Sequence, residues 1–244
     1  MRVQTQGLRH PQSGRGAGTC VTGSESAPQP LPRGRHKLSK VEVLESQRER
    51  LLIAMEEQVN ENGYAGASVP KVVRRARVTD RTFYRLFEDK ADCFIATCER
   101  HGDQLRELLA AYVHEIENAE DPMAAFDAGL HMYLQWWMDR PAGARAFFVD
   151  ILVVGDRAFA SRDRRASMFA DALRRIAAVL RSRVGVQGEP CDVDAVAAAA
   201  LASELVAREV RAGRIAELPH LHSDLRRVLL LLLLAQAPHA SVDP

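Results

Sequence analysis

Residues 63–90 read GYAGASVPKVVRRARVTDRTFYRLFEDK, and this stretch decides the fold. Its first half is a short amphipathic segment that Ser68 caps, with Pro70 in the first turn, where amides lack an intrahelical partner. About three residues later, Thr79 caps a second short segment, whose apolar side includes Phe83. Two short helices joined by a tight turn predict a helix-turn-helix.

The second segment has two contrasting sides. Phe83, Leu86 and Phe87 form its apolar stripe, and the opposite side carries hydrogen-bonding groups. A short helix held on one side fits the major groove of DNA, where Arg81 and Arg85 can each bind a guanine edge through two hydrogen bonds. Taken alone, the same polar side also fits an ordinary solvated helix surface. The residues expected to contact DNA are Arg33, Arg35, Lys71, Thr79, Asp80, Arg81, Thr82, Tyr84, Arg85 and Lys90.

The charge of the chain is concentrated locally. All 244 residues together carry a formal net charge of +1, so the overall charge does not indicate a nucleic-acid partner. Residues 33–90, however, contain 13 Lys and Arg residues against 9 Asp and Glu residues. The basic arm at 33–37 suits a minor groove or a phosphate backbone, although an idle terminus could have the same composition.

Helical periodicity continues on both sides of this stretch. Upstream, apolar residues from Leu44 to Val59 share one helical face, and Asn62-Gly63 is a typical stop signal. Downstream, no segment shows convincing strand alternation. The expected helices there are 90–118, which Asp89 can cap, 122–139, 142–154, 157–184, 192–213 and 221–236. The predicted fold class is all-α with about nine helices, in which a three-helix helix-turn-helix domain precedes a helical bundle.

The chain divides into three expected parts. Residues 1–32 are rich in Gly, Ser, Gln and Pro and have almost no apolar periodicity, which fits a disordered extension or a start codon assigned too early. Residues 33–90 form the expected DNA-binding domain, and 91–238 the expected ligand-binding and dimerisation domain. A hydrophobic content of 47% over 244 residues suffices for such a division.

Several function classes lack their signatures. The four cysteines form no CxxC pair and no His/Cys spacing resembles a zinc site, so reduced thiols in the cytoplasm are expected, without a metal or cofactor. No secretory signal is visible, and the apolar run 228–235 is far shorter than the roughly 20 residues that span a bilayer. An enzyme is not expected because no catalytic set or phosphate loop appears. The alternatives are an all-α enzyme and a protein–protein module with a vestigial helix-turn-helix.

Several motifs closely resemble the amino-terminal signature of the TetR/AcrR regulators. They are Gly63-Tyr64, Ser68-Val69, Ala76-Arg77-Val78-Thr79 and the run TFYRLFEDK at 82–90. The resemblance covers about residues 33–236, and 204–213 looks like the dimer-forming region of actinobacterial members. It implies a sequence-specific transcription regulator, typically a repressor that a small ligand releases from its operator. It also implies that Thr82, Tyr84 and Lys90 touch phosphates and that Asp80, Arg81 and Arg85 approach bases.

Two residues depart from the family pattern. Arg77 stands where the family usually has glycine, and a positive φ there would cost an arginine on the order of 1 kcal/mol. Asp80 is acidic in a setting rich in phosphate. It either accepts a hydrogen bond from a cytosine amino group or caps the helix beside Thr79.

The resemblance further implies a small-molecule cavity within the helices of 91–184. The expected lining residues are Phe126, His131, Tyr133, Trp136, Trp137, Phe147 and Phe148. The alternative is that aromatic residues at helical spacing form only a core, and that His131 is an ordinary core or surface histidine.

The last two expected helices have the composition of an interface between two copies. Residues 193–206 are rich in alanine, which allows close helix approach, and the leucine run 229–234 exceeds what one flank of a single domain buries. A two-fold homodimer would present two reading helices to a roughly palindromic DNA site. The expected interface residues are Leu201, Leu205, Leu225, Val228, Leu229 and Leu232.

Overall fold

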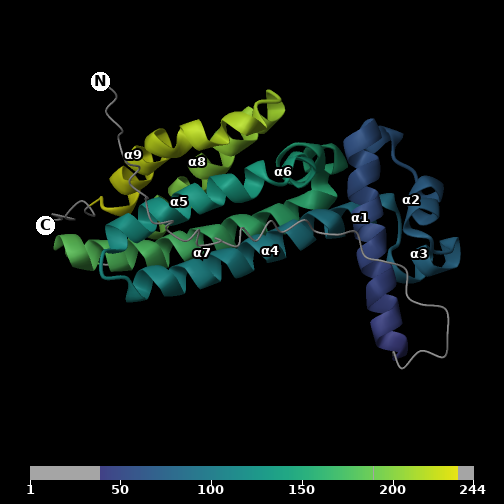
Figure 1. Cartoon of the computed structure of the whole chain (residues 1–244), viewed down its shortest axis with the longest axis horizontal. Helices are drawn as coiled ribbons and strands as arrows, with labels where there is room; N and C mark the ends of the chain where they lie inside the picture. The colour runs from purple at the N-terminus through teal and green to yellow at the C-terminus, as the bar shows by residue number, and fades with distance from the viewer. Residues whose placement is uncertain (1–38, 189, 236–244) are drawn as a thin grey trace, which may run out of the picture.

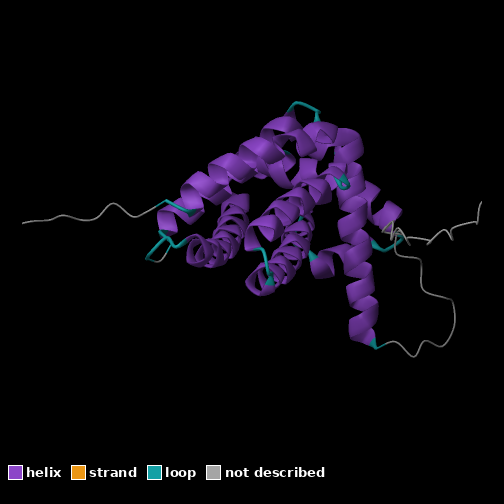
Figure 2. Cartoon of the chain, turned by 60° about the vertical axis from the view of Figure 1, so that its left-hand side comes forward, coloured by secondary structure: helices purple, strands orange, loops and turns teal. Residues whose placement is uncertain are grey.

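The computed structural model describes residues 39–188 and 190–235, and within them every regular element is a helix (Figure 2). The predicted all-α class is therefore confirmed, with nine α-helices and two 3-10 helices in the described residues. They are α1 (Lys40–Gly66), α2 (Val69–Ala76), α3 (Asp80–Leu86), α4 (Lys90–Asn118), α5 (Pro122–Met138), α6 (Pro141–Phe148), η1 (Asp150–Ala158), α7 (Phe159–Val184), α8 (Asp192–Arg211), η2 (Ile215–Leu221) and α9 (His222–Leu233). The expected extension 1–32 and the basic arm lie outside the described residues.

The helices form two units that share α4. Helices α4, α5, α7, α8 and α9 lie alongside one another as a bundle, and α1 crosses one end of it (Figure 1). The two short helices α2 and α3 pack on α1, on its side away from the bundle (Figure 1). We call α1–α3 the head and the elements from α4 to α9 the body. Since α4 begins beside the head and extends along the bundle, it connects the two units directly.

Each unit has its own hydrophobic core. The head core contains Leu51, Phe83 and Phe94, all fully buried, and it continues along α4 as far as Cys98. Ala146 and Ile151, from α6 and η1, also belong to this core. The head core thus extends beyond residue 90, because the first turns of α4 and the α6–η1 segment supply part of its apolar surface.

Side-chain caps fix the starts of several helices. The Thr79 hydroxyl accepts the Thr82 amide at 3.2 Å, and the Asp89 carboxylate accepts the Asp92 amide at 2.9 Å, so both predicted caps are formed. Ser39 and Glu42 form a reciprocal capping box at the start of α1. Ser68 occupies the predicted cap position of α2 in an extended conformation, but its side chain makes no cap hydrogen bond.

Most helix boundaries lie within about three residues of the sequence expectation, and three segments differ in type or ending. Gly63 has a φ of 68° and kinks α1, yet a further turn follows, so α1 ends at Gly66. The expected helix 142–154 is instead α6 followed by η1, in which Gly155 has a φ of 72°. The segment Ile215–Leu221, expected to be a break, is the 3-10 helix η2. Apolar periodicity does not distinguish a tight 3-10 segment from an α-helix or a loop, because packing of a few side chains decides between them.

Candidate nucleic-acid interface and bundle cavity

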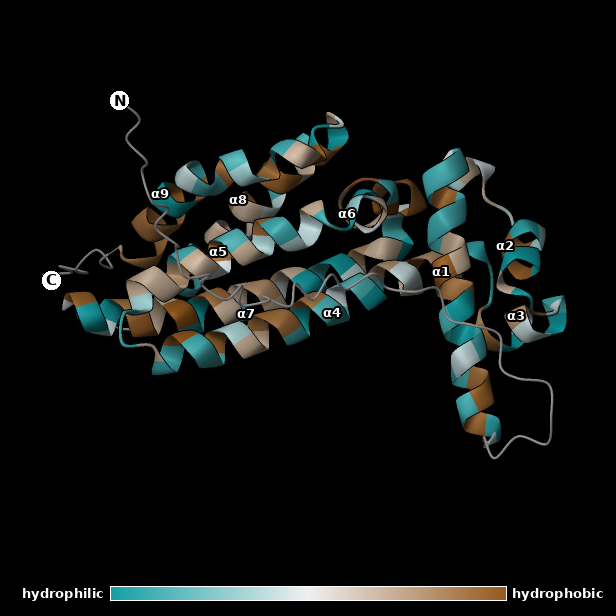
Figure 3. Cartoon of the chain, viewed as in Figure 1, coloured by the Kyte–Doolittle hydropathy of each residue, from teal (hydrophilic) through white to brown (hydrophobic). Residues whose placement is uncertain are grey.

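The second helix of the motif, α3, buries one side and exposes the other. Phe83 is fully buried and Phe87 is 4% exposed, and their rings lie 5.6 Å apart in the head core. Tyr84 is 61% exposed, and Arg81 is exposed as well. Hydrophilic residues gather on the outer sides of α2 and α3, away from α1 (Figure 3). The head core thus supports α3 on one side and leaves its polar side exposed, as insertion of a helix into the major groove of DNA requires.

Most of the residues expected to contact DNA lie on this outer side. Asp80 and Arg85 are exposed beside Arg81 and Tyr84, and the Arg85 guanidinium donates to Gln47 Oε1 of α1 at 3.3 Å. Thr79 is exposed and Thr82 half-buried, with their hydroxyl oxygens 3.1 Å apart. Thr79 already caps α3, so Asp80 is not the N-cap residue. Arg33 and Arg35 lie outside the described residues.

The two lysines of the expected DNA contacts bind backbone carbonyls. Lys71 Nζ donates to the Gly66 carbonyl at 3.0 Å from an exposed position. Lys90 Nζ donates to the carbonyls of Tyr64 at 2.9 Å and Ala67 at 3.2 Å, and it lies 4.2 Å from the centroid of the Tyr64 ring. Lys90 therefore ties the α1–α2 connection to the start of α4 and uses two of its three ammonium donors in doing so.

The turn between α2 and α3 contains Arg77, which stands where related regulators usually have glycine. Arg77 has φ 53° and ψ 47°, and among the described residues it is the one non-glycine with a positive φ. Arg50 Nη1 of α1 donates to the Ala76 carbonyl at 3.0 Å and holds this turn from behind. Sequence reasoning missed Arg50, because a charged residue on an amphipathic helix carries no signal of its distant partner.

The body contains a cavity of about 550 Å³ between α4, α5, α6, α7 and α8. Of the expected lining residues, Tyr133, Phe147 and Phe148 line this cavity. Burial raises the pKa of the Tyr133 hydroxyl, which therefore stays protonated. Sequence reasoning missed several other lining residues, including Leu105, Arg165, Phe169 and Ala199.

The other residues expected at the cavity lie elsewhere. Phe126 and Trp137 are buried in the body core. Trp136 is half-buried beneath the Arg140 guanidinium, 4.6 Å from its ring centroid. His131 is exposed, and its ring lies 6.2 Å from that of His222 in α9. The structure thus separates a packed aromatic core from the smaller aromatic set that lines the cavity.

Helix α6 links the cavity to the head. Ala146 is 2% exposed within the head core, and its carbonyl lies 3.5 Å from Cys98 Sγ. The next two residues, Phe147 and Phe148, line the cavity. Any displacement of these two rings must therefore act on the backbone that also packs against the head.

The residues expected at an interface between copies differ in exposure. Leu225 and Leu229 are 0% and 2% exposed, because they pack into the body core of their own chain. Leu201, Leu205, Val228 and Leu232 are half-buried. Leu231, which was not among the expected residues, is 63% exposed on α9. Within the described residues, no helix is long and apolar enough to cross a membrane, and no cluster of three His, Cys, Asp or Glu residues could hold a metal ion.

Comparisons with known proteins find similar sequences and similar folds. Residues 51–97 match the model of the bacterial regulatory proteins of the tetR family. No curated protein matches the chain. Among solved structures, the fatty acid degradation regulator FadR from Bacillus halodurans is 16% identical with a TM-score of 0.62, over 75% of this chain and 94% of its own.

Two further structures show the same arrangement. A TetR-family regulator from Pectobacterium atrosepticum is 23% identical with a TM-score of 0.58, over 82% of this chain and 100% of its own. FadR from Bacillus subtilis, in complex with stearoyl-CoA, is 18% identical with a TM-score of 0.55, over 75% of this chain and 96% of its own. At these identities the likeness concerns the fold.

Proposed function

We propose that this chain, whose residues 51–97 match the model of the tetR family of bacterial regulatory proteins, is a regulator of that family. In this proposal, α3 reads an operator in double-stranded DNA, and a small ligand in the bundle cavity controls this binding. The observation that carries the proposal is the exposed polar side of α3, held in place by Phe83 and Phe87 in the head core. Arg81 and Arg85 read bases, and Tyr84, Thr82 and Lys90 hold phosphates.

Two copies act together on a roughly palindromic operator. The homodimer forms through α8 and α9, which carry the half-buried Leu201, Leu205 and Val228 and the exposed Leu231. Two-fold symmetry then sets the two copies of α3 about 34–36 Å apart, one turn of duplex DNA. The dimer works in the cytoplasm, where it represses transcription by occupying the operator.

The ligand acts through elements that touch both units. It fills the cavity, displaces Phe147 and Phe148, and thereby moves Ala146 and the start of α4 against the head. The ligand shifts this equilibrium only by its difference in affinity between the two arrangements of the head. In the ligand-bound arrangement, the two copies of α3 no longer match the operator spacing.

Selection of bound fragments from a random DNA pool tests the reading face. The full chain should enrich a palindrome. Arg81→Ala should relax one base position in each half-site, at a cost of about 1–3 kcal/mol in discrimination. Arg183→Ala, an exposed arginine at the far end of α7, serves as the matched control and should leave the selected sequence unchanged. Failure of the full chain to enrich any sequence would instead favour a protein–protein module.

A further inference from the structure

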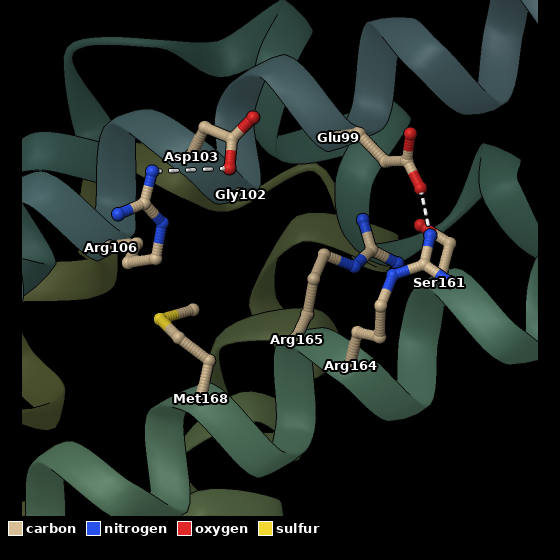
Figure 4. A pocket seen from close by; sticks show the side chains of 8 residues that line it. All are labelled: Glu99, Gly102, Asp103, Arg106, Ser161, Arg164, Arg165 and Met168. Atoms are coloured by element: carbon tan, nitrogen blue, oxygen red, sulfur yellow. Dashed lines mark hydrogen bonds and ion pairs between the residues drawn. The ribbon is translucent and has the colours of Figure 1, made fainter.

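A second hollow, of about 350 Å³, lies between α4 and α7 and is lined largely by charged side chains (Figure 4). Two ion pairs neutralise most of this charge. Asp103 pairs with Arg106 at 3.5 Å, and Glu99 pairs with Arg164 (Figure 4). The fifth charged lining residue, Arg165, belongs to neither pair.

Arg165 is half-buried, and two of the three nitrogens of its guanidinium are buried without a hydrogen-bonding partner. Its Nε and Nη1 are shielded from solvent and have no acceptor in the described part of the chain, while the Phe147 ring lies 4.1 Å from its central carbon. Burial lowers the pKa of Arg165, but an arginine side chain keeps its proton in proteins. A buried cation that lacks an acceptor is costly, so its retention here calls for an anion that comes from outside the chain.

A second polar group accompanies Arg165. The Ser161 hydroxyl, one helical turn earlier on α7, belongs to a residue that is 2% exposed and has no partner in the described residues. Gly102 of α4 leaves room for the arginine stem, since a Cβ at that position would lie 3.0 Å from Arg165 Cδ. Two buried donors therefore point into one hollow that carries no free carboxylate of its own.

Arg165 also connects this hollow with the larger cavity. It lines both spaces. The larger one has apolar lining residues, such as Leu105, Phe148 and Phe169, and it also has charged ones, which are Arg162, Asp163, Glu204 and Arg211. A molecule bound across the two would place a charged group beside Arg165 and an apolar body among the aromatic rings. The combined shape matches the usual ligand pocket, which is mostly apolar with a few orienting polar groups.

We propose that Arg165, with Ser161, is the anion-binding element of the ligand site, and that the ligand is an amphipathic anion with a carboxylate or phosphate head and an apolar body. This assignment rests on the proposed function, because it identifies the ligand class of the same cavity. Arg165 stacks on Phe147, whose neighbour Ala146 packs in the head core, so binding of the anion bears directly on the head.

Calorimetric titration of the full chain with matched probes tests the proposal. The probes are decanoate, decyl phosphate, decan-1-ol and acetate, which separate the head group from the apolar body. At least one of the two long-chain anions should bind about tenfold or more tightly than decan-1-ol, and acetate should bind far more weakly, since both parts contribute. The stronger of the two anions identifies the head group. Equal binding of decan-1-ol and both anions overturns the proposal.

Arg165→Met and Arg175→Met form a matched pair of arginine variants on α7. Arg165→Met should abolish the preference for the anion while leaving decan-1-ol binding intact. Arg175→Met, which removes a 57% exposed side chain from an ion pair with Glu117 outside both cavities, should keep the preference within about threefold. Without ligand, the thermal midpoint of Arg165→Met should equal or exceed that of the parent chain, because an unpaired buried cation is removed. A preference that survives Arg165→Met overturns the assignment.

DNA selection keeps this inference separable from the proposed function. If the chain enriches an operator but shows no preference for the anion, the proposed regulatory function stands and the proposed ligand class is wrong. If the chain binds the anion through Arg165 but enriches no DNA, the anion site stands and the proposed DNA-binding function is wrong. Addition of the preferred anion to the operator complex should release the DNA in the parent chain, and Arg165→Met should remain bound at the same concentration.

Discussion

Arg77 adopts the left-handed conformation at the point where the chain turns from α2 into α3. An L-residue with a side chain loses about 1 kcal/mol there relative to glycine, because its Cβ crowds the following carbonyl. The turn is nevertheless held, since the Arg77 amide donates to the Arg74 carbonyl at 3.3 Å and Arg50 braces the Ala76 carbonyl from α1. The orientation of α3 therefore depends on a strained residue that its neighbours keep in place.

We expect Arg77→Gly to stabilise the protein. Removal of the side chain should relieve the strain and raise the free energy of unfolding by about 1 kcal/mol, or the thermal midpoint by about 2–4 °C for a chain of this size. The control is Arg74→Gly, at an exposed helical position of α2, where glycine should lower stability by about 0.5–1 kcal/mol. Thermal unfolding of both variants checks the prediction. A lower midpoint for Arg77→Gly would show that the left-handed turn is not strained.

At the residue scale, sequence reasoning succeeds where the cause is local. Thr79 and Asp89 were predictable as caps because a cap bonds to an amide within three residues. The partners of Arg50 and Lys90 were not predictable, since each lies about 26 positions away in the chain. Arg165 was missed for a related reason: an arginine on a long amphipathic helix is usually solvated, and only packing shows that this one is buried.

The junction between α1 and α4 is an ionic cluster at the base of the head. Glu56 of α1 lies 3.3 Å from Arg100 Nη1 and 3.0 Å from His101 Nε2, and its side chain is only 17% exposed. Burial alone would raise the pKa of Glu56, but the hydrogen bond from His101 and the charges of His101 and Arg100 outweigh it and hold this pKa below 4.5. The head and the body are therefore tied together by a carboxylate that is ionised at neutral pH.

We expect Glu56→Gln to weaken this junction at neutral pH. Loss of charge-assisted hydrogen bonds should lower the free energy of unfolding by about 1–3 kcal/mol at pH 7. Because the folded pKa lies below that of the unfolded chain, the contribution of Glu56 is complete above pH 4.5 and disappears as the pH falls through the folded value. The gap between variant and parent should then shrink below pH 4.5.

Urea unfolding at pH 7 and at successively lower pH values measures this gap. Glu107→Gln, at an exposed position of α4, is the control and should match the parent chain throughout. A gap of constant size down to pH 3 would show that the carboxylate charge of Glu56 does not stabilise the junction.

At the element scale, the helices with a continuous apolar stripe were predictable nearly to the residue. The expected helix 90–118 coincides with α4, and 122–139 differs from α5 by one residue. The 3-10 segments η1 and η2 were not predictable, since Ile151 and Leu218 are buried by helices distant in sequence. Fold class follows from periodicity, whereas the bends that shape the cavity follow from tertiary packing.

At the scale of the whole molecule, the leucine run at 229–234 is divided between the body core and the surface. Leu229 and Leu233 are 2% and 1% exposed and complete the body core, so much of the run is already buried within one chain. Leu231 points outward and is 63% exposed. In the proposed dimer, a second copy covers Leu231 together with the half-buried apolar residues of α8 and α9.

We expect Leu231→Arg to convert the proposed dimer into a monomer. Arginines from both copies would meet near the two-fold axis, where like charges repel and burial of a cation is costly. Sedimentation should then give 27.0 kDa in place of twice that mass. Affinity for a palindromic operator should fall by about a hundredfold or more, because the second head no longer binds intramolecularly. Val153→Arg, which alters a 64% exposed residue of η1, should leave both the mass and the operator affinity unchanged. A dimer that persists in Leu231→Arg would place the interface elsewhere on the body.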